Sequence, residues 1–303
     1  MKIILFADPG LGEACLNQLV AHHATPAFVV PPRSGDINRE TIIKASHRHN
    51  IPVVMFDHRP NEQRFVERIR ELEPDLILVA GFSHLIPEQL YLSARVAAIN
   101  AHPSLLPEYR GANPYYHVIA NGEKETGVTL HLLDSAFDTG DILSQSAIPI
   151  LPRETMGTLI KRLAQLAADE MVILVEKIKR TGLPPSTKQP AKARFQAKRI
   201  THWQIEWALP AVQIDRRIRA LNPYYRANTH LGSITLAIFS GMCSQTMTRL
   251  PPGDVITIDN IGVHVSTGEG VYCIRALSFG SEWVGDAIGA ADNKLIDIGD
   301  HLE

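Results

Sequence analysis

Two nearby stretches of sequence decide how this chain folds. Residues 96–114 read VAAINAHPSLLPEYRGANP, and residues 126–143 read TGVTLHLLDSAFDTGDIL. The first stretch begins with a short apolar run at 96–99, which is typical of a buried strand. Because side chains alternate between the two faces of a strand, we expect Asn100 and His102 on the same face.

Polar groups follow that predicted strand at the point where α/β proteins usually bind ligands. Pro103 disfavours helical backbone at His102, so the extended geometry should continue through the histidine. In open α/β sheets, ligands bind at the carboxyl ends of the strands. The second stretch ends in Asp138-Thr139-Gly140-Asp141, a turn sequence with two carboxylates. An amide, an imidazole and a carboxylate are sufficient to bind a developing oxyanion and to move a proton.

Either motif alone is more common as a structural pair or as a capped or metal-binding turn. Together with Ser104-Leu105-Leu106-Pro107 and Arg110-Gly111, they resemble the signature of the formyltransferases that use 10-formyltetrahydrofolate. The resemblance is close over residues 75–145 and looser over residues 1–180. It implies a one-carbon transferase with 10-formyltetrahydrofolate as co-substrate. The catalytic residues that it implies are Asn100, His102 and Asp138.

The resemblance also implies residues that contact the two substrates. In the family, the segment that matches residues 81–87 packs against the pterin ring. The expected folate-binding residues are Phe82, His84, Leu85, Ile86 and Asp134, and the expected substrate-binding residues are Gly10, Gly12, Ser104 and Arg110.

Three of these assignments have alternatives in the sequence. Chemistry does not choose between Asp138 and Asp141, and only the family pattern favours Asp138. Arg110 either contacts an anionic group of the substrate or holds its own loop. Ser104 lacks a Gly-x-Ser-x-Gly elbow, so a structural role is more plausible for it than that of a nucleophile. We expect no metal site, because the histidine pairs at 22–23 and 47/49 lack a clear ligand set.

Strands and helices alternate through the first 180 residues, which predicts a doubly wound, mostly parallel, Rossmann-like α/β sheet. The predicted strands are residues 2–7, 27–30, 52–55, 75–79, 96–99, 126–133 and 142–150, and the predicted helices are residues 11–20, 38–49, 62–71, 115–120 and 155–178. Gly10 and Gly12 follow the first strand, as in a dinucleotide site. Cys15 stands where that fingerprint needs a third glycine, so a turn near the substrate is favoured over NAD binding.

The last third of the chain has a different pattern. Residues 181–200 are rich in proline and polar residues and are expected to form a linker between a catalytic domain, residues 1–180, and a C-terminal domain, residues 201–303. A helix is predicted at 211–222. Short strands broken by Pro251-Pro252-Gly253 and by later glycines then predict a small β-barrel-like, OB-like domain.

The composition excludes several classes of protein. The 303 residues carry 30 Lys and Arg against 32 Asp and Glu, a net charge of −2, so no global basic field indicates nucleic acid. Three distant cysteines argue against a disulfide framework and favour a reducing cytoplasm. The N-terminal MKIILFADPG is too short for a signal peptide, and no run of about 18 apolar residues indicates a membrane span.

The acceptor is the least determined part of the prediction. Methionyl-tRNA formyltransferases carry a basic, glycine-rich insertion after the second strand, whereas residues 31–37 here are short and not basic. We therefore expect a small amine, such as a nucleotide-linked amino sugar, with methionyl-tRNA as the alternative. Lys188, Lys192, Arg194, Lys198 and Arg199 form a basic cluster, but solvated charges are the usual role of such residues in a linker. A formyltetrahydrofolate hydrolase and a non-catalytic nucleotide- or tRNA-binding relative are weaker alternatives.

Overall fold

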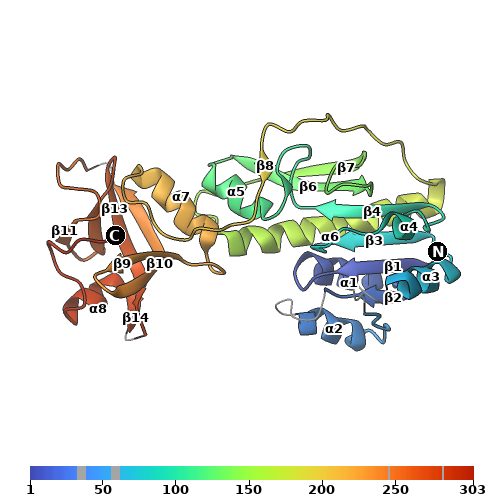
Figure 1. Ribbon diagram of the computed structural model, residues 1–303, viewed down its shortest axis with the longest axis horizontal. Coiled ribbons are helices and arrows are strands. Elements are labelled where there is room, and N and C mark those ends of the chain that lie inside the picture. The colour runs from blue at the N-terminus through green and yellow to red at the C-terminus, as the bar shows by residue number, and fades with distance from the viewer. Residues whose placement is uncertain (33–38, 56–61, 245, 282) are drawn as a thin grey trace. The chain divides into compact units, whose positions relative to one another are not determined.

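The computed structural model describes residues 1–32, 39–55, 62–244, 246–281 and 283–303, and these form two compact units (Figure 1). The first unit contains residues 1–114, 125–149 and 160–198. The second contains residues 115–124, 150–159 and 199–303.

The first unit is built on a six-stranded sheet. In spatial order the strands are β2 (Phe28–Val30), β1 (Ile3–Ala7), β3 (Leu76–Ala80), β4 (Ala97–His102), β6 (Glu125–Leu132) and β7 (Ile142–Pro149). The first four are parallel, and β6 and β7 run antiparallel to their neighbours. Every residue of β1 and β3 is buried, as expected for strands covered on both faces. The predicted mostly parallel, Rossmann-like sheet is confirmed.

Helices cover both faces of this sheet. The helices are α1 (Leu11–Ala21), α2 (Arg39–Arg48), α3 (Glu62–Glu71), α4 (Glu88–Tyr91) and α6 (Met156–Thr181). A further helix, α5 (Pro114–Ala120), lies in the second unit from residue 115 onward. On one face, Phe65 of α3 meets Phe6 of β1 edge-on, with ring centroids 6.3 Å apart. On the other, Gln18 of α1 donates a hydrogen bond to Asp169 of α6 over 3.0 Å. Alternate residues of each central strand therefore face opposite helical layers.

Two details differ from the predicted elements. The strand expected at 52–55 is reduced to one bridge between Val53 and Val29, because Pro52 has no N–H to extend the ladder. The helix expected at 38–49 is α2, Arg39–Arg48, and residue 38 lies outside the described residues.

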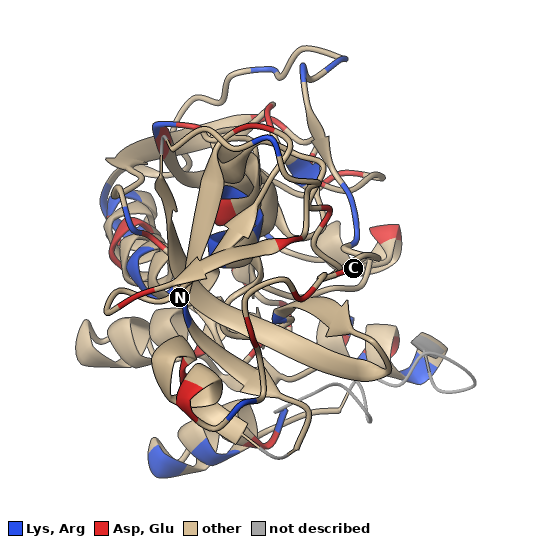
Figure 2. Ribbon diagram, turned by 90° about the vertical axis from the view of Figure 1, so that its left-hand side faces the viewer, with Lys and Arg blue, Asp and Glu red and all other residues tan. Residues whose placement is uncertain are grey.

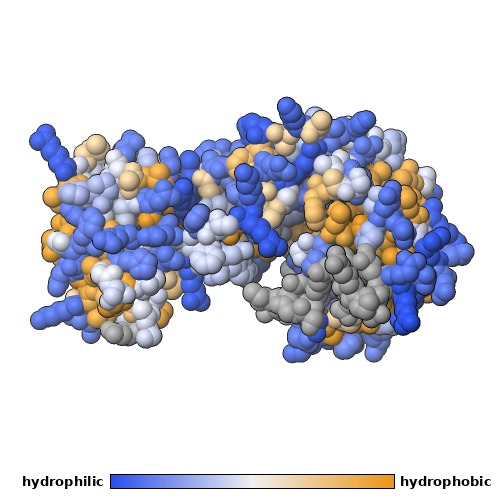
Figure 3. Space-filling view, viewed as in Figure 1, coloured by the Kyte–Doolittle hydropathy of each residue, from blue (hydrophilic) through white to orange (hydrophobic). Residues whose placement is uncertain are grey.

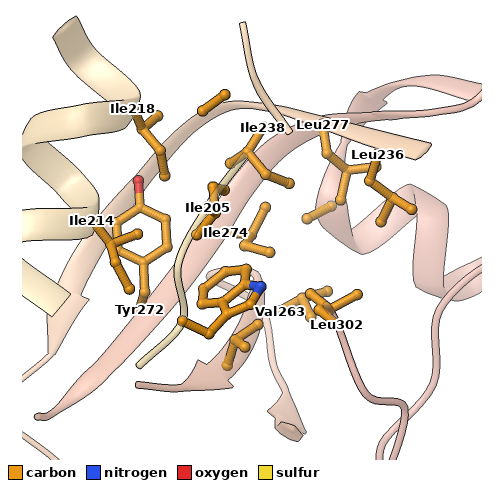
Figure 4. Close-up of a cluster of buried hydrophobic side chains, with 14 of the residues drawn as sticks. Ile205, Ile214, Ile218, Leu236, Ile238, Val263, Tyr272, Ile274, Leu277 and Leu302 are labelled. Atoms are coloured by element: carbon orange, nitrogen blue, oxygen red, sulfur yellow. The ribbon is translucent and has the colours of Figure 1, made fainter. Parts of the chain in front are cut away.

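The second unit is an antiparallel sheet with α7 (Ala211–Leu221) and α8 (Ala287–Asp292). Its strand order is β11 (Val255–Ile258), β12 (Val263–Ser266), β13 (Val271–Phe279), β10 (Ile234–Ser244) and β9 (Ala227–Leu231), with β14 (Trp283–Asp286) paired to β13. Ile214 and Ile218 of α7 point at Tyr272 of β13 in the core (Figure 4). The change of pattern expected after residue 201 is thus a change from a parallel to an antiparallel sheet.

Three segments belong to a different unit from the one in which a division into consecutive domains would place them. Residues 181–198, expected to form a linker, belong to the first unit, whereas residues 115–124 and 150–159 belong to the second. Within the second unit, Arg219 donates a hydrogen bond over 2.9 Å to the carbonyl of Glu154. Gly157 lies against Pro223 in the same unit, which holds this segment on α7.

The exposed surface is mixed in character. Hydrophobic and hydrophilic side chains alternate over the face shown in Figure 3. Among the helices in the described ranges, none combines the length and the apolar character that crossing a bilayer requires.

The remaining strands form a small feature that the sequence did not predict. A two-stranded pair joins β5 (Arg110–Gly111) to β8 (Gln196–Ala197), with Arg110 opposite Gln196. This pair brings the end of the expected linker onto the loop after β4.

Candidate active site

The site begins with two neighbouring strands at the middle of the first sheet. Asn100 of β4 lies directly opposite His131 of β6, and His102 lies opposite Thr129. Cross-strand partners share a face, so the Asn100 amide nitrogen lies 3.0 Å from Nε2 of His131. Nδ1 of His131 lies 2.8 Å from the carbonyl oxygen of Leu132 and can only donate to it. Nδ1 therefore carries the hydrogen, and Nε2 accepts from Asn100.

The loop after β6 brings Asp138 to the same place. Its Oδ1 lies 3.3 Å from Nδ1 of His102, 3.3 Å from Nδ2 of Asn100 and 3.7 Å from Nε2 of His131. Its Oδ2 accepts a 2.9 Å hydrogen bond from the backbone N–H of Gly111. The structure thus brings Asn100, His102 and Asp138 together around one carboxylate.

His102 lies between two hydrogen-bond acceptors. Besides Asp138 at Nδ1, its Nε2 lies 2.9 Å from the carbonyl oxygen of Tyr109. Each ring nitrogen then needs a hydrogen, which describes the protonated imidazolium. Burial alone would lower the pKa of His102, but the charge and hydrogen bond of Asp138 and the Tyr109 carbonyl raise it above 6.5.

Asp138 is held in the ionised form. Burial alone would raise its pKa, but the charge and hydrogen bond of His102 and the Gly111 N–H together hold it well below 3.8. Asp138 is therefore a strong acceptor of hydrogen bonds and a poor acceptor of a proton near neutral pH.

A cavity that is open to solvent lies against this cluster. Its walls combine apolar and polar groups, and they include all five residues expected to bind folate: Phe82, His84, Leu85, Ile86 and Asp134. Asn100, His131 and Asp138 line it as well, whereas His102, 4% exposed, lies behind Asp138. This mix of apolar walls with a few polar groups suits a heterocyclic ring such as a pterin.

Of the four expected substrate-binding residues, Gly12, Ser104 and Arg110 are buried and Gly10 is exposed. The backbone N–H groups of Gly10 and Gly12 both donate to Asp8, at 3.1 and 3.0 Å. Burial raises the pKa of Asp8 to about 6, although these N–H groups oppose the rise. Ser104 is fully buried, and its hydroxyl donates to the carbonyl of Glu108.

Arg110 takes a position that fits the second of its two expected roles, that of holding its loop. The side chain is buried, and its guanidinium donates to Gln189, Pro190 and Ala191 at 2.7–3.3 Å.

The structure places Asp138 and Asp141, which chemistry alone could not distinguish, in different surroundings. Asp141 accepts a 3.2 Å hydrogen bond from Ser186, while Asp138 faces the histidines. His131 was missed in the sequence, although its alternation with Thr129 in a predicted strand was a usable signal. In the described ranges, no three His, Cys, Asp or Glu side chains are grouped as a metal site would require.

An imidazolium–carboxylate pair and an amide donor lie together at the carboxyl edge of an α/β sheet, and groups of these kinds can stabilise the oxyanion of an acyl transfer. The Formyl transferase family matches residues 1–175, and the family Formyl transferase, C-terminal domain, matches residues 201–284. The chain therefore belongs to the formyl transferase family and transfers a formyl group from formyltetrahydrofolate.

Curated relatives of similar length carry one name. The chain is 30% identical to "Methionyl-tRNA formyltransferase" of Clostridium perfringens over 287 residues, which is 92% of each protein. It is 29% identical to the protein of the same name from Legionella pneumophila, over 92% of this chain and 91% of the relative.

Solved structures show the same fold at lower identity. An N-formyltransferase from Helicobacter canadensis, in complex with folinic acid and dTDP-3-aminofucose, superimposes with a TM-score of 0.70 at 19% identity. The match covers 90% of this chain and 98% of that one. The sugar 3N-formyl transferase WlaRD gives 0.68 at 21% identity, over 90% and 96%. These likenesses concern the fold.

Proposed function

We propose that this enzyme formylates the amino group of methionyl-tRNA, with Asn100, His102 and Asp138 as the catalytic residues. The acceptor is supported by the shared name of curated relatives that match 92% of the chain. The residue roles are supported by one observation above all: Asn100 and His102 both contact the Asp138 carboxylate, which lies beside the cavity.

The reaction exchanges one carbon–nitrogen bond for another. The neutral amine of the acceptor forms a bond to the formyl carbon, and the bond from that carbon to the folate nitrogen breaks. The amine loses one proton and the folate nitrogen gains one, so no oxidant or further reactant is needed. Negative charge develops on the formyl oxygen on the way, and stabilising this charge is the main task of the protein.

Asn100 supplies the neutral hydrogen-bond donor. A carboxylate has no N–H, so it is the amide nitrogen of Asn100 that faces Asp138 and His131. One of these two N–H groups turns to the formyl oxygen when the donor binds. An amide serves at any physiological pH because it does not titrate.

His102 and Asp138 supply the charge. The positive charge of the His102 imidazolium attracts the developing oxyanion electrostatically. A rotation of the ring away from Asp138 or Tyr109 would also let it donate a hydrogen bond to the oxyanion. Asp138 keeps that imidazolium charged and accepts a hydrogen bond from the attacking amine. Because its pKa is so low, Asp138 orients this amine, directly or through water, and the proton continues to the leaving folate nitrogen.

A small amine, such as a nucleotide-linked amino sugar, is the second candidate. Figure 2 shows Lys and Arg interspersed with Asp and Glu, in keeping with the net charge of −2. Phosphate-driven affinity for tRNA depends on clustered cations, so a balanced surface favours a smaller acceptor. The short stretch after β2 that first indicated this reading, residues 31–37, lies outside the described residues from position 33 onward.

An acceptor screen tests both readings. Purified enzyme is given 10-formyltetrahydrofolate with methionyl-tRNA, with nucleotide-linked amino sugars, or with no acceptor, and formylated product and free formate are measured. Formyl-methionyl-tRNA as the main product supports the proposal. Faster formylation of a nucleotide amino sugar replaces it with the second candidate, and formate release without an acceptor identifies a hydrolase.

A further inference from the structure

The segment at residues 187–197, here called the strap, is fastened along the loops that carry the site. Thr187 exchanges two backbone hydrogen bonds with Ile142, each 2.8 Å long. The Glu108 carboxylate accepts from the backbone N–H groups of Arg194 and Phe195 at 2.9 and 2.8 Å. All of these residues belong to the first unit. The strap is therefore part of the folded catalytic unit.

One side chain of the strap reaches the loop that holds Asp138. The Gln189 side chain is buried, and its Nε2 donates to the carbonyl oxygens of Asp138 at 3.2 Å and of Gly140 at 2.6 Å. Its Oε1 accepts from Nε and Nη2 of Arg110, at 3.1 and 2.7 Å. Because arginine only donates, these contacts fix which way round the amide lies.

The backbone at Asp138 needs such support. Its φ is +59°, a left-handed conformation that residues other than glycine rarely adopt. The carbonyl groups of Asp138 and Gly140 both accept hydrogen bonds from the Gln189 amide, which holds the turn on each side of Thr139. A residue in a sparsely populated conformation persists where its surroundings determine it from several sides.

The strap also acts on the Asp138 carboxylate from the opposite direction. The Gly111 N–H that donates to Oδ2 belongs to β5, which pairs with β8 of the strap. A Cβ on Gly111 would lie 2.5 Å from the carbonyl oxygen of Ala197, so only glycine allows this close pairing. The strap thus bears on both the backbone and the side chain of Asp138.

We propose that Gln189 is a positioning residue for formyl transfer, which acts through Asp138 and is itself held by Arg110. The inference rests on the catalytic role given to Asp138 in the proposed function. It also explains why an amide stands at position 189. A glutamate would pair more strongly with Arg110 but would turn a carboxylate oxygen, which cannot donate, toward two carbonyl oxygens.

Gln189→Glu is therefore the decisive variant. It keeps the shape of the side chain and the contact with Arg110, but it removes the hydrogen bonds to the carbonyl oxygens of Asp138 and Gly140. Gln145→Glu is the matched control. Gln145 is a partly buried glutamine of the same unit, and it donates to the carbonyl of Leu106 and the hydroxyl of Thr129 at 2.6 and 3.0 Å. Both variants place a carboxylate against a backbone carbonyl, but only one of them faces the Asp138 turn.

Two readouts separate positioning from general stability. The first is the NMR titration of the His102 imidazole, identified by the signal that His102→Asn removes. The charged group that faces this ring is the Asp138 carboxylate, and the titratable His131 lies across Asp138 from it. The second readout is kcat against KM for 10-formyltetrahydrofolate with methionyl-tRNA as acceptor. Thermal melts show that each variant is folded.

Gln189→Glu is expected to move the His102 titration to lower pH and to reduce kcat by about a hundredfold, with KM changed far less. Gln145→Glu is expected to change neither readout by more than about twofold. Equal effects of the two variants on both readouts would overturn the inference. If Gln189→Glu does not fold, Arg110→Lys takes its place, since lysine keeps the charge but lacks the fork that orients Gln189.

Asp138→Ala distinguishes a failure of this inference from a failure of the proposed function. Loss of turnover in Asp138→Ala with normal turnover and an unmoved titration in Gln189→Glu would reject the role of Gln189 alone. Normal turnover in Asp138→Ala would reject the catalytic role itself, while the titration would still show whether Gln189 positions Asp138.

Discussion

Nδ1 of His102 and Oδ1 of Asp138 lie 3.3 Å apart, and both side chains are nearly excluded from solvent. In this setting each group stabilises the charged form of the other, which is why the pKa of His102 rises and that of Asp138 falls. The Asp138 carboxylate lines the cavity, and the His102 imidazolium lies behind it. This fixed positive charge offsets the repulsion that the carboxylate alone would exert on an oxyanion forming in the cavity.

Asn100→Ala should lower kcat for formyl transfer by roughly a hundredfold to a thousandfold, the usual effect of removing one oxyanion donor. Affinity for folate should change little, because the lost hydrogen bond matters most in the transition state. Steady-state kinetics with a thermal melt of the variant measure both. A fall in folate affinity that accounts for the whole effect would show Asn100 to be a binding residue.

His131 should act through Asn100, whose N–H it accepts over 3.0 Å. We expect His131→Ala to reduce kcat by about tenfold and the double variant with Asn100→Ala to be no slower than Asn100→Ala alone. A double-mutant cycle on kcat measures this. Additive losses in the cycle would mean that His131 contributes independently of the amide.

The role proposed for the charged His102 predicts how the reaction rate depends on pH. Because Asp138 raises the pKa of His102 above 6.5, the imidazolium is lost only as the pH rises through that higher value, and activity should fall there. Asp138→Asn should bring the NMR titration of His102 down to 6.5 or lower, since burial without the carboxylate lowers the pKa. An unmoved titration in Asp138→Asn would contradict the assigned pairing.

The same pair makes a pH-dependent contribution to stability. The raised pKa of His102 stabilises the fold fully below pH 6.5, and this contribution disappears as the pH rises through the pKa of the folded protein. The lowered pKa of Asp138 stabilises the fold above pH 3.8, and this contribution disappears as the pH falls. As the pH rises above 6.5, wild type should therefore lose more unfolding free energy than Asp138→Asn. Parallel pH profiles in urea denaturation would argue against the pair.

The core of the second unit offers a test of its packing. Ile218 is fully buried on α7, so Ile218→Ala should destabilise that unit by about 2–5 kcal/mol through loss of burial and the cavity left behind. Val212 on the same helix is 48% exposed, and Val212→Ala should change stability by less than about 0.5 kcal/mol. Urea unfolding followed by circular dichroism compares the two, and similar losses would mean that α7 does not pack through Ile218.

Much of the fold was readable from local pattern. The apolar runs and their alternation with helical segments predict the parallel strands, because burial on both faces demands continuous apolar sequence. The convergence of Asn100 and His102 follows from strand periodicity alone. The placement of Asp138 does not, since it depends on a left-handed turn held from 51 residues away by Gln189.

Long-range packing explains what the sequence did not show. Residues 181–200 look like a linker because they are rich in proline and polar groups, yet side chains such as Gln189 and Glu108 fasten most of them to the first unit. Nothing in the periodicity of a segment without helix or strand indicates which loop it will lie against. The identity of the acceptor cannot be read from the sequence pattern either. Its contacts depend on surface charge and shape, which differ among proteins that share one fold.

The central claim is that Asp138, with His102 and Asn100, carries out formyl transfer. Its most direct test is the single-turnover rate of transfer from 10-formyltetrahydrofolate to the acceptor identified in the screen, compared between wild type and a folded Asp138→Asn variant. We predict a rate at least about a hundredfold lower in the variant, with unchanged folate binding. A variant rate within about threefold of wild type would contradict the account.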